Sequence, residues 1–250
     1  MEKCHYIESG AATTRDLLIA VCVFLAIAGA AGAVVLIFRG WTIAVIALIG
    51  LLLGISYSGK PLELGYHGLG ELVIGLMFGP LLMIGMQYAA CGIISEAMIW
   101  TCVAVGLLVT NIVYSHAVLD LKADAQAEKM TFARLLKSNN MRLFFSALFN
   151  ILPFIIVIIG VVLGHLHWAY LCVMPLLPMG IYIIYSLKAH LDNKEIAFEP
   201  RWWMGPMGNF DSYRKHNMDW FLIRWLVARN LVTFFCLILM IVNIILAIYK

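Results

Sequence analysis

Two aspartates stand four residues apart where a long apolar stretch ends. They are Asp120 and Asp124, in the segment YSHAVLDLKADAQAEKMTFARLL at residues 114–136. On a helix that continues past the apolar stretch, carboxylates at this spacing face the same way and repel each other. Mg²⁺ relieves such repulsion, and it typically takes one or two carboxylates together with phosphate oxygens and water. The spacing therefore favours a magnesium site at Asp120 and Asp124 that binds a phosphate-bearing ligand.

Lysines flank the same aspartates and allow a second interpretation. Lys122 and Lys129 would add positive charge for an anion bound at this site. They would equally well pair with Asp120 and Asp124 in a solvated loop, which is the usual context of so short a motif. The choice between these interpretations depends on a second polar segment of the chain.

That second segment, YSGKPLELGYHGLGELVIGLMFGP at residues 57–80, is rich in glycine. It contains two candidates for catalysis, Tyr57 and Lys60, and three candidates for substrate binding, Tyr66, His67 and Glu71. Glycines let the backbone approach a ligand closely, and a lysine ammonium suits phosphate. In the alternative interpretation the segment is a tight connector in which Gly and Pro only turn the chain. Together with the aspartates, the segment favours a site that combines carboxylates for a metal with a cation for an anion.

The rest of the chain predicts a bundle of membrane helices that positions these segments. Of its 250 residues, 63% are hydrophobic and 12% are charged, which leaves no room for a soluble domain. Backbone amides in hydrocarbon must be paired within their own segment, and no segment alternates with the two-residue period of a barrel strand. We therefore predict an all-α polytopic bundle that lies in a lipid bilayer. Its seven spans are expected at 16–38, 41–57, 71–94, 97–119, 142–164, 168–187 and 220–249.

The basic residues predict how this bundle is oriented. Twelve of the 17 Lys and Arg residues fall in the N-terminus and the loops 58–70, 120–141 and 188–219, and Arg142 and Arg224 follow two of these loops and make fourteen on this side, whereas Arg39 and Lys250 fall on the other side. Because basic loops stay in the cytoplasm, we expect a multi-pass protein of the cell (inner, cytoplasmic) membrane whose N-terminus and polar loops are cytoplasmic. The net charge of +3 resides in these loops and gives no reason to expect a nucleic-acid partner.

Taken together, these motifs resemble those of a known family. Tyr57-Ser-Gly-Lys-Pro, then GYHGLGE at 65–71 running into a helix with Phe-Gly-Pro at 78–80, then Asp120-x-x-x-Asp124-x-x-x-x-Lys129-x-Thr131, is similar to the UbiA-type intramembrane prenyltransferases. Within that family the chain is most similar to the 1,4-dihydroxy-2-naphthoate polyprenyltransferases of menaquinone biosynthesis. The resemblance extends from about residue 15 to residue 135 and more loosely through the later spans.

The resemblance implies a magnesium-dependent transferase that moves a prenyl group from a prenyl diphosphate to an aromatic acceptor. The family has two aspartate motifs that face each other across a cytoplasmic-side cavity. By this resemblance Asp120 and Asp124 form the second metal motif, Lys60 contacts the diphosphate, and Tyr57 and Tyr66 line the cavity mouth. Lys129 is a second, weaker candidate for contact with the diphosphate. Loss of diphosphate leaves an allylic carbon with cationic character, which aromatic rings would stabilise and the acceptor would attack.

Two departures from the family pattern bear on this expectation. Where the naphthoate branch usually shows a paired Asn and an Arg before its aspartate, this chain has Ser115, His116 and Leu119. The identity of the acceptor is therefore open, and His116 is either a polar contact in the cavity or a plain interfacial residue. The family also usually has nine spans, with its first aspartate motif near the end of the second span. We interpret residues 1–250 as one domain and expect it to lack the first two helices of the family and the first aspartate motif. Either the sequence starts late within a longer protein, or the protein has lost half of its metal site.

Polar residues inside the spans are further candidates for substrate contact. Asn111 precedes Asp120 by about two and a half helical turns and either faces the substrate or bonds a neighbouring helix. Arg229 and Asn230 lie within the last span and are expected to face inward. The aromatic-rich loop 199–225 is typical of a segment at the headgroup level, and the alternative is a lid over the cavity.

Two other classes of function compete with the transferase. One is a non-catalytic member that binds isoprenoid diphosphate or depends on a partner chain. The other is a small membrane transporter, which would place carboxylates near the bilayer midplane, often on broken helices. Here the acids stand at helix ends, which favours the transferase.

Overall fold

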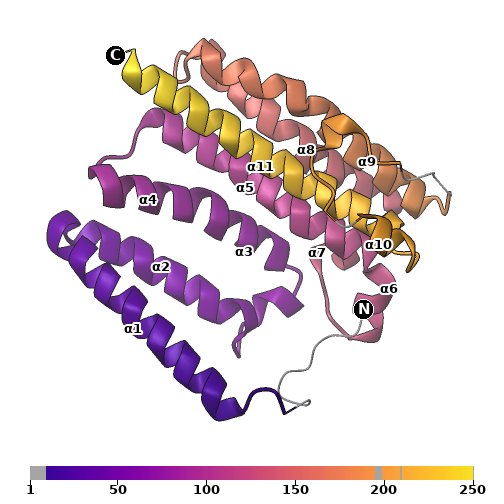
Figure 1. The fold of residues 1–250 in the computed structure, drawn as a ribbon, viewed down its shortest axis with the longest axis horizontal. Helices are drawn as coiled ribbons and strands as arrows, with labels where there is room; N and C mark the ends of the chain where they lie inside the picture. Colours follow the sequence, from indigo (N-terminus) through magenta and orange to yellow (C-terminus); the bar gives the residue numbers. More distant parts are fainter. Residues whose placement is uncertain (1–9, 195–198, 209, 250) are drawn as a thin grey trace. The chain divides into compact units, whose positions relative to one another are not determined.

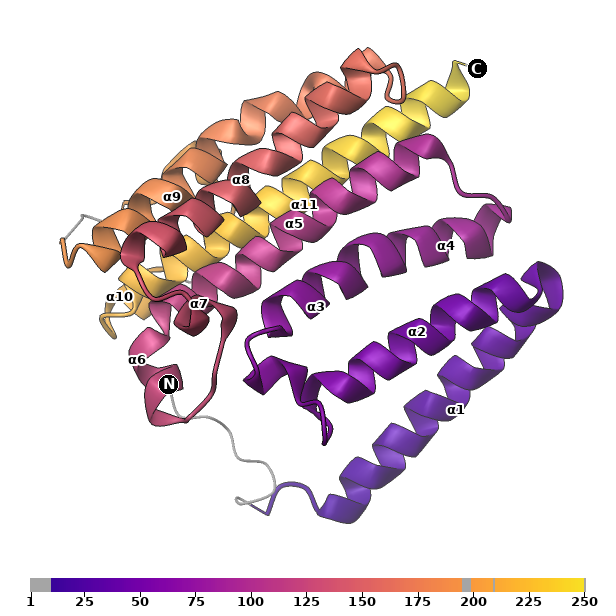
Figure 2. The same ribbon diagram turned by 180° about the vertical axis from the view of Figure 1, so that it is seen from behind.

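The computed structural model describes residues 10–194, 199–208 and 210–249. The first nine residues, which the charge pattern places in the cytoplasm, lie outside this description. Seven helical segments in the described ranges are long and apolar enough to span a membrane, as the sequence predicts. No strand occurs in these ranges, and the backbones of His67 and Met130 form an isolated parallel bridge. The protein is therefore an all-α, multi-pass membrane protein (Figures 1 and 2).

Each span begins and ends within a few residues of its predicted bounds. Two spans are composite: the third joins α3 (Gly70–Leu76), a π-helical segment η2 (Met77–Leu81) and α4 (Leu82–Cys91), and the sixth joins η3 (Trp168–Leu176) to α9 (Leu177–Leu191). Pro80 and Pro175 lie in the irregular parts, which fits their lack of a backbone N–H. The remaining spans are α1 (Thr14–Arg39), α2 (Trp41–Ser58), α5 (Glu96–Leu119), α8 (Asn139–Val162) and α11 (Asp219–Ile248).

The chain divides into two compact units, Met1–Ala47 and Leu48–Lys250. In the first unit, Thr13 and Asp16 form a capping box at the start of α1, with the Thr13 amide donating to Asp16 Oδ2 over 2.9 Å. None of the α1 residues is buried. The reading of the whole chain as one prenyltransferase-like domain stays a prediction.

Helix α5 is the centre of the second unit. It packs against α8, α11, α3 and η2, and more than half of its residues are buried. Figures 1 and 2 both show α11 running along α5, with α3 on another side of α5. Since the chain leaves α5 at Asp120, the packing of this one helix sets where the aspartate motif stands.

Glycines bring the third span against α5. A Cβ on Gly79 would lie 2.3 Å from the Cα of Gly106, and a Cβ on Gly75 would lie 2.7 Å from the carbonyl oxygen of Gly106. The two glycines are four residues apart, which is the small-xxx-small pattern that lets membrane helices approach closely. This contact fixes the start of α3, and with it Glu71, beside the end of α5.

The loop before α11 does not stay at the end of the bundle. Its segment η4 (Trp202–Met204) packs between α9 and α11, with Trp203 edge-on to Tyr182 at 5.6 Å between ring centroids. The Asn230 amide donates to the carbonyl oxygens of Met204 and Pro206 over 2.8 and 3.0 Å. Arg229 donates to the second of these over 3.1 Å. Arg229 and Asn230 thus provide hydrogen-bond donors to carbonyl groups of an irregular backbone segment.

Candidate active site

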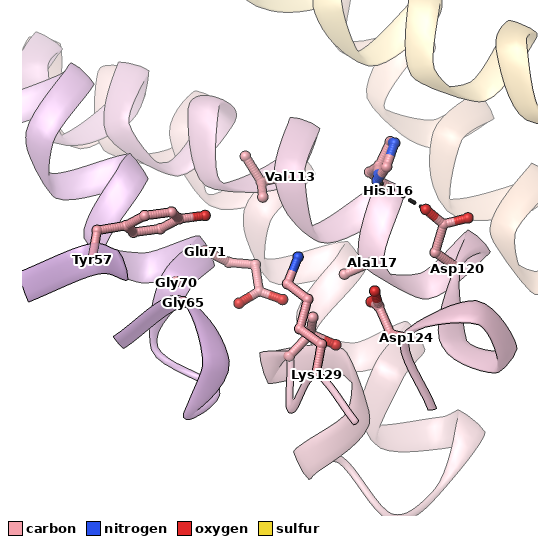
Figure 3. Close-up of a pocket in the computed structure, with 11 residues that line it drawn as sticks. Tyr57, Gly65, Gly70, Glu71, Val113, His116, Ala117, Asp120, Asp124 and Lys129 are labelled. Carbon is pink, nitrogen blue, oxygen red and sulfur yellow. Dashed lines mark ion pairs between the residues drawn. The ribbon is translucent and has the colours of Figure 1, made fainter. Parts of the chain in front are cut away.

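The two motifs singled out in the sequence meet in one cavity of about 70 Å³. The cavity lies within the second unit, at the end of α5 where the aspartates stand. From the glycine-rich segment come Tyr57, Gly65, Gly70 and Glu71, and from α5 and the chain that follows it come Val113, His116, Ala117, Asp120, Asp124, Lys129 and Thr131. Most of these residues are labelled in Figure 3.

Glycines of the GYHGLGE stretch make room for the Tyr57 ring. A Cβ on Gly65 would lie 3.2 Å from Cζ of Tyr57, and a Cβ on Gly70 would lie 3.4 Å from its Cε2. Gly68 serves a different purpose, because its φ of +79° is left-handed and a Cβ there would collide with Leu135. Gly65 and Gly70 therefore position Tyr57 at the cavity, and Gly68 lets Leu135, in the loop after the aspartates, pack against the GYHGLGE stretch.

The aspartates lie on a nearly continuous helical path. Asp120 follows the last residue of α5 and precedes α6 (Leu121–Gln126), and the Asp124 amide donates to the Asp120 carbonyl over 2.8 Å. The Lys129 amide in turn donates to the Asp124 carbonyl over 2.9 Å. Arg134 Nη1 donates to the carbonyl oxygens of both Asp124 and Lys129, over 3.1 and 2.5 Å. The aspartates and Lys129 are thus held on one braced loop.

Glu71 joins the glycine-rich segment to this loop. Its side chain is only 2% exposed, and its Oε1 accepts the amide of Phe132 over 2.9 Å. Phe132 is the first residue of the short helix α7 (Phe132–Leu135). Figure 3 shows the Lys129 side chain reaching into the space between Glu71 and Asp124. The buried carboxylate therefore both fixes the loop and faces the lysine.

His116 and Asp120 are in contact one helical turn apart. His116 Nδ1 lies 3.3 Å from Oδ2 of Asp120, and both side chains are partly exposed (Figure 3). The ring of Phe221, in the first turns of α11, meets the His116 ring edge-on at 4.9 Å between centroids. His116 thus lines the cavity, and its contact with the substrate stays a prediction.

Thr131 is a cavity residue that we did not select as a site residue from the sequence. It is 4% exposed, and its hydroxyl is buried without a hydrogen-bond partner. The available signal was its place two residues after Lys129 in the motif that resembles the family. A threonine in an otherwise polar loop has no distinguishing sequence pattern, so only the folded structure shows that Thr131 is buried.

Four of the ten predicted site residues lie outside the cavity lining. Lys60, Tyr66 and His67 are exposed, and His67 Nδ1 lies 3.0 Å from the backbone oxygen of Glu63. Asn111 is buried between α5 and α8, where its amide exchanges hydrogen bonds of 3.0 and 2.7 Å with the amide of Asn150. The structure thus gives Asn111 the role of a bond between helices, the second of its two interpretations.

The donor set of the cavity fits Mg²⁺ that is shared with a phosphate ligand. Within the described ranges, no group of three or more His, Cys, Asp and Glu side chains could hold a metal ion. Mg²⁺ does not require such a group, because it typically binds one or two carboxylates plus substrate phosphates and water. Asp120 and Asp124 supply the carboxylates, and Thr131, which also lines the cavity, has a buried hydroxyl without a hydrogen-bond partner.

The fold and the cavity define a multi-pass membrane protein with an acidic pocket at one end of its central helix. Comparison with known proteins identifies the family: the chain matches the model of the UbiA prenyltransferase family over residues 7–205 and belongs to that family.

Individual proteins similar to this chain give a more specific comparison than the family does. A 1,4-dihydroxy-2-naphthoate octaprenyltransferase of Mycobacterium tuberculosis is 32% identical over 145 residues, covering 57% of this chain and 49% of the relative. A 2-carboxy-1,4-naphthoquinone phytyltransferase of Synechocystis is 26% identical over 184 residues, covering 72% of this chain and 59% of the relative. The chain thus spans about half the length of these relatives. No solved structure matches it.

Proposed function

We propose that this protein is an intramembrane prenyltransferase that moves a prenyl group from a prenyl diphosphate to an aromatic quinone precursor. The observation that carries the proposal is that the two motifs meet in one cavity, with Tyr57 and Glu71 on one side and the aspartates and Lys129 on the other. Family membership and the names of the relatives support a naphthoate-type acceptor and a place in menaquinone biosynthesis.

The charges of the cavity explain why binding of a diphosphate would require a metal. Three carboxylates, of Glu71, Asp120 and Asp124, face one ammonium, of Lys129. A bare diphosphate would be repelled by this excess of negative charge. Asp120 and Asp124 would hold Mg²⁺, which when bound supplies positive charge to the diphosphate and stabilises it as a leaving group.

The chain's own residues would divide the remaining work. The bond between the allylic carbon and the diphosphate oxygen breaks, a bond from that carbon to the acceptor ring forms, and the ring loses a proton. Lys129 would stabilise the charge that develops on the departing diphosphate. The Tyr57 ring would stabilise the cationic allylic carbon, because the face of an aromatic ring attracts cations.

The membrane helices fit such a substrate, since the apolar prenyl tail can remain in the bilayer while its diphosphate occupies the cavity. We further propose that the cavity opens to the cytoplasmic side of the cell membrane, as the distribution of Lys and Arg indicates. The diphosphate end of the donor would then lie on the cytoplasmic side while its prenyl tail stays in the bilayer.

Removal of divalent metal tests this proposal. We expect the protein in nanodiscs to bind a fluorescent prenyl diphosphate in Mg²⁺ buffer, to lose this binding in EDTA, and to regain it when excess Mg²⁺ is added. Addition of 1,4-dihydroxy-2-naphthoate should then yield a prenylated product that mass spectrometry detects. Binding that persists in EDTA would contradict the proposed metal site. Mg²⁺-dependent binding without product formation would favour the non-catalytic binder, and absence of both would favour a transporter.

A further inference from the structure

Two buried side-chain oxygens in the described part of the chain lack a hydrogen-bond partner. They are the hydroxyls of Thr131 and Ser146, whose side chains are 4% and 1% exposed. A buried hydroxyl without a hydrogen-bond partner lowers the stability of the fold, so each of the two needs an explanation. The two hydroxyls lie in different surroundings, and this difference indicates which of them serves a ligand.

Ser146 is enclosed by helices, whereas Thr131 lines the cavity. Ser146 lies within α8, and its backbone oxygen accepts the amide of Asn150 over 2.8 Å. Thr131 borders the same cavity as Asp124 and Lys129. A ligand that enters the cavity therefore comes next to Thr131, whereas Ser146 is not among the residues that line it.

The backbone around Thr131 is already fixed. The amides of Arg134 and Leu135 donate to the Thr131 carbonyl over 3.0 and 3.1 Å. The next amide, of Phe132, donates to Glu71. The Thr131 carbonyl and the amide that follows it are thus engaged, and the Thr131 hydroxyl is a buried side-chain group left for another molecule. A donor held in place before the ligand arrives costs little ordering on binding.

We propose that the Thr131 hydroxyl donates a hydrogen bond to the diphosphate end of the substrate; this inference rests on the function proposed above. Lys129 is two residues away on the same braced loop and lines the same cavity, so ammonium and hydroxyl together form a donor pair. A diphosphate offers several charged acceptor oxygens, and hydrogen bonds to charged groups are the stronger ones. The acceptor ring offers no such density of charge.

This assignment predicts opposite effects on stability and on binding. Thr131→Val keeps the branched shape but removes the hydroxyl, so the ligand-free protein should unfold at an equal or higher temperature. Affinity for the diphosphate should nevertheless fall by about tenfold or more, the usual effect of losing a hydrogen bond to a charged group. A threonine that only supported the loop would lose stability and affinity together.

The experiment measures dissociation constants of farnesyl S-thiolodiphosphate, which reacts poorly, and of farnesol, which lacks the diphosphate. Both are titrated in Mg²⁺ buffer against the full chain in nanodiscs. Thr131→Val should weaken binding of the diphosphate probe but not of farnesol, and Thr131→Ser should restore it. Ser146→Ala is the matched control, because it removes the other unpaired hydroxyl and should leave both constants unchanged.

The outcomes separate the two proposals. If the parent binds the diphosphate probe and Thr131→Val binds it equally well, the Thr131 assignment is overturned and the proposed function stands. Equal weakening for both probes would also overturn the assignment, since the change would then act on the cavity as a whole. If the parent fails to bind the diphosphate probe in Mg²⁺, the proposed function is contradicted, and the Thr131 contact with it.

Discussion

Asp124→Asn is expected to lower the rate of prenyl transfer by about 100-fold or more, an effect comparable to the loss of one preorganised electrostatic group. The substitution keeps the shape of the side chain but removes the charge that would hold Mg²⁺. It also relieves repulsion among the cavity carboxylates, so the thermal unfolding temperature in EDTA should not fall. Initial rates at saturating Mg²⁺ and prenyl diphosphate, with thermal unfolding measured in parallel, test this expectation.

Asp192→Asn provides the control for this substitution. Asp192 follows the last residue of α9, is partly exposed, pairs with Lys194 at 3.8 Å and does not line the cavity. The same chemical change there should leave the rate within about twofold of the parent. An Asp124→Asn protein that retains the parent rate and the parent requirement for Mg²⁺ would show that the aspartates are ordinary loop residues.

Removing the Glu71 carboxylate should damage both stability and activity. Glu71→Leu leaves the Phe132 amide without its buried partner, which is expected to lower the free energy of unfolding by about 1–3 kcal/mol. The loop that carries Lys129 and Thr131 would then shift, and misplacement of such groups by about 1 Å can cost on the order of 100-fold in rate. Chemical denaturation and transfer rates would measure the two effects separately.

Glu71→Gln distinguishes the hydrogen bond from the charge. A glutamine can still accept the Phe132 amide, so most of the stability should remain while the negative charge facing Lys129 is lost. Glu128→Gln is the matched control, since Glu128 is an exposed carboxylate on the same loop outside the cavity lining. If Glu71→Leu has the same free energy of unfolding and the same transfer rate as the parent, Glu71 does not join the two motifs as we describe.

The elements of the fold could be predicted from the sequence because spanning helices have a strong signal. Each apolar run is bounded by glycine, proline or charged residues, and the helix ends fall close to these residues. The π-helical interruption at Met77–Leu81 was harder to predict from the sequence, although Pro80 lies within it. Which helices pack together was not predictable from hydropathy, since helices that face lipid and helices that face protein are equally apolar.

The sequence predicted part of the site, and the predicted residues that lie outside the cavity do so for identifiable reasons. Tyr57, Glu71, Asp120, Asp124 and Lys129 flank helix ends that converge, so motif and geometry agree. Lys60 belongs to the same stretch as Tyr57, but the turn that follows α2 leaves it exposed. Asn111 shows the limit of counting helical turns, because its direction depends on Asn150, which lies 39 residues further along the chain.

The loop before α11 shows a second limit of sequence patterns. Its tryptophans are typical of the headgroup level, which stays a prediction, and the pattern did not indicate that η4 packs against α9 and α11 or that neither Trp202 nor Trp203 lines the cavity. The signal for this arrangement was present in α11, where Arg229 and Asn230 interrupt an apolar helix. Their partners in the preceding loop are backbone carbonyls, which a sequence pattern does not identify.

The most direct test of the central claim is to locate the bound prenyl diphosphate in the chain. A prenyl diphosphate analogue with a photoreactive group next to its diphosphate would be crosslinked to the protein in Mg²⁺ buffer, and the modified peptides would be mapped by mass spectrometry. We predict that EDTA abolishes the crosslinks and that they map to the cavity lining, at Tyr57, Val113, Ala117 and Lys129. Crosslinks confined to the larger groove near Tyr170 and Asn243, or unchanged by EDTA, would contradict the account.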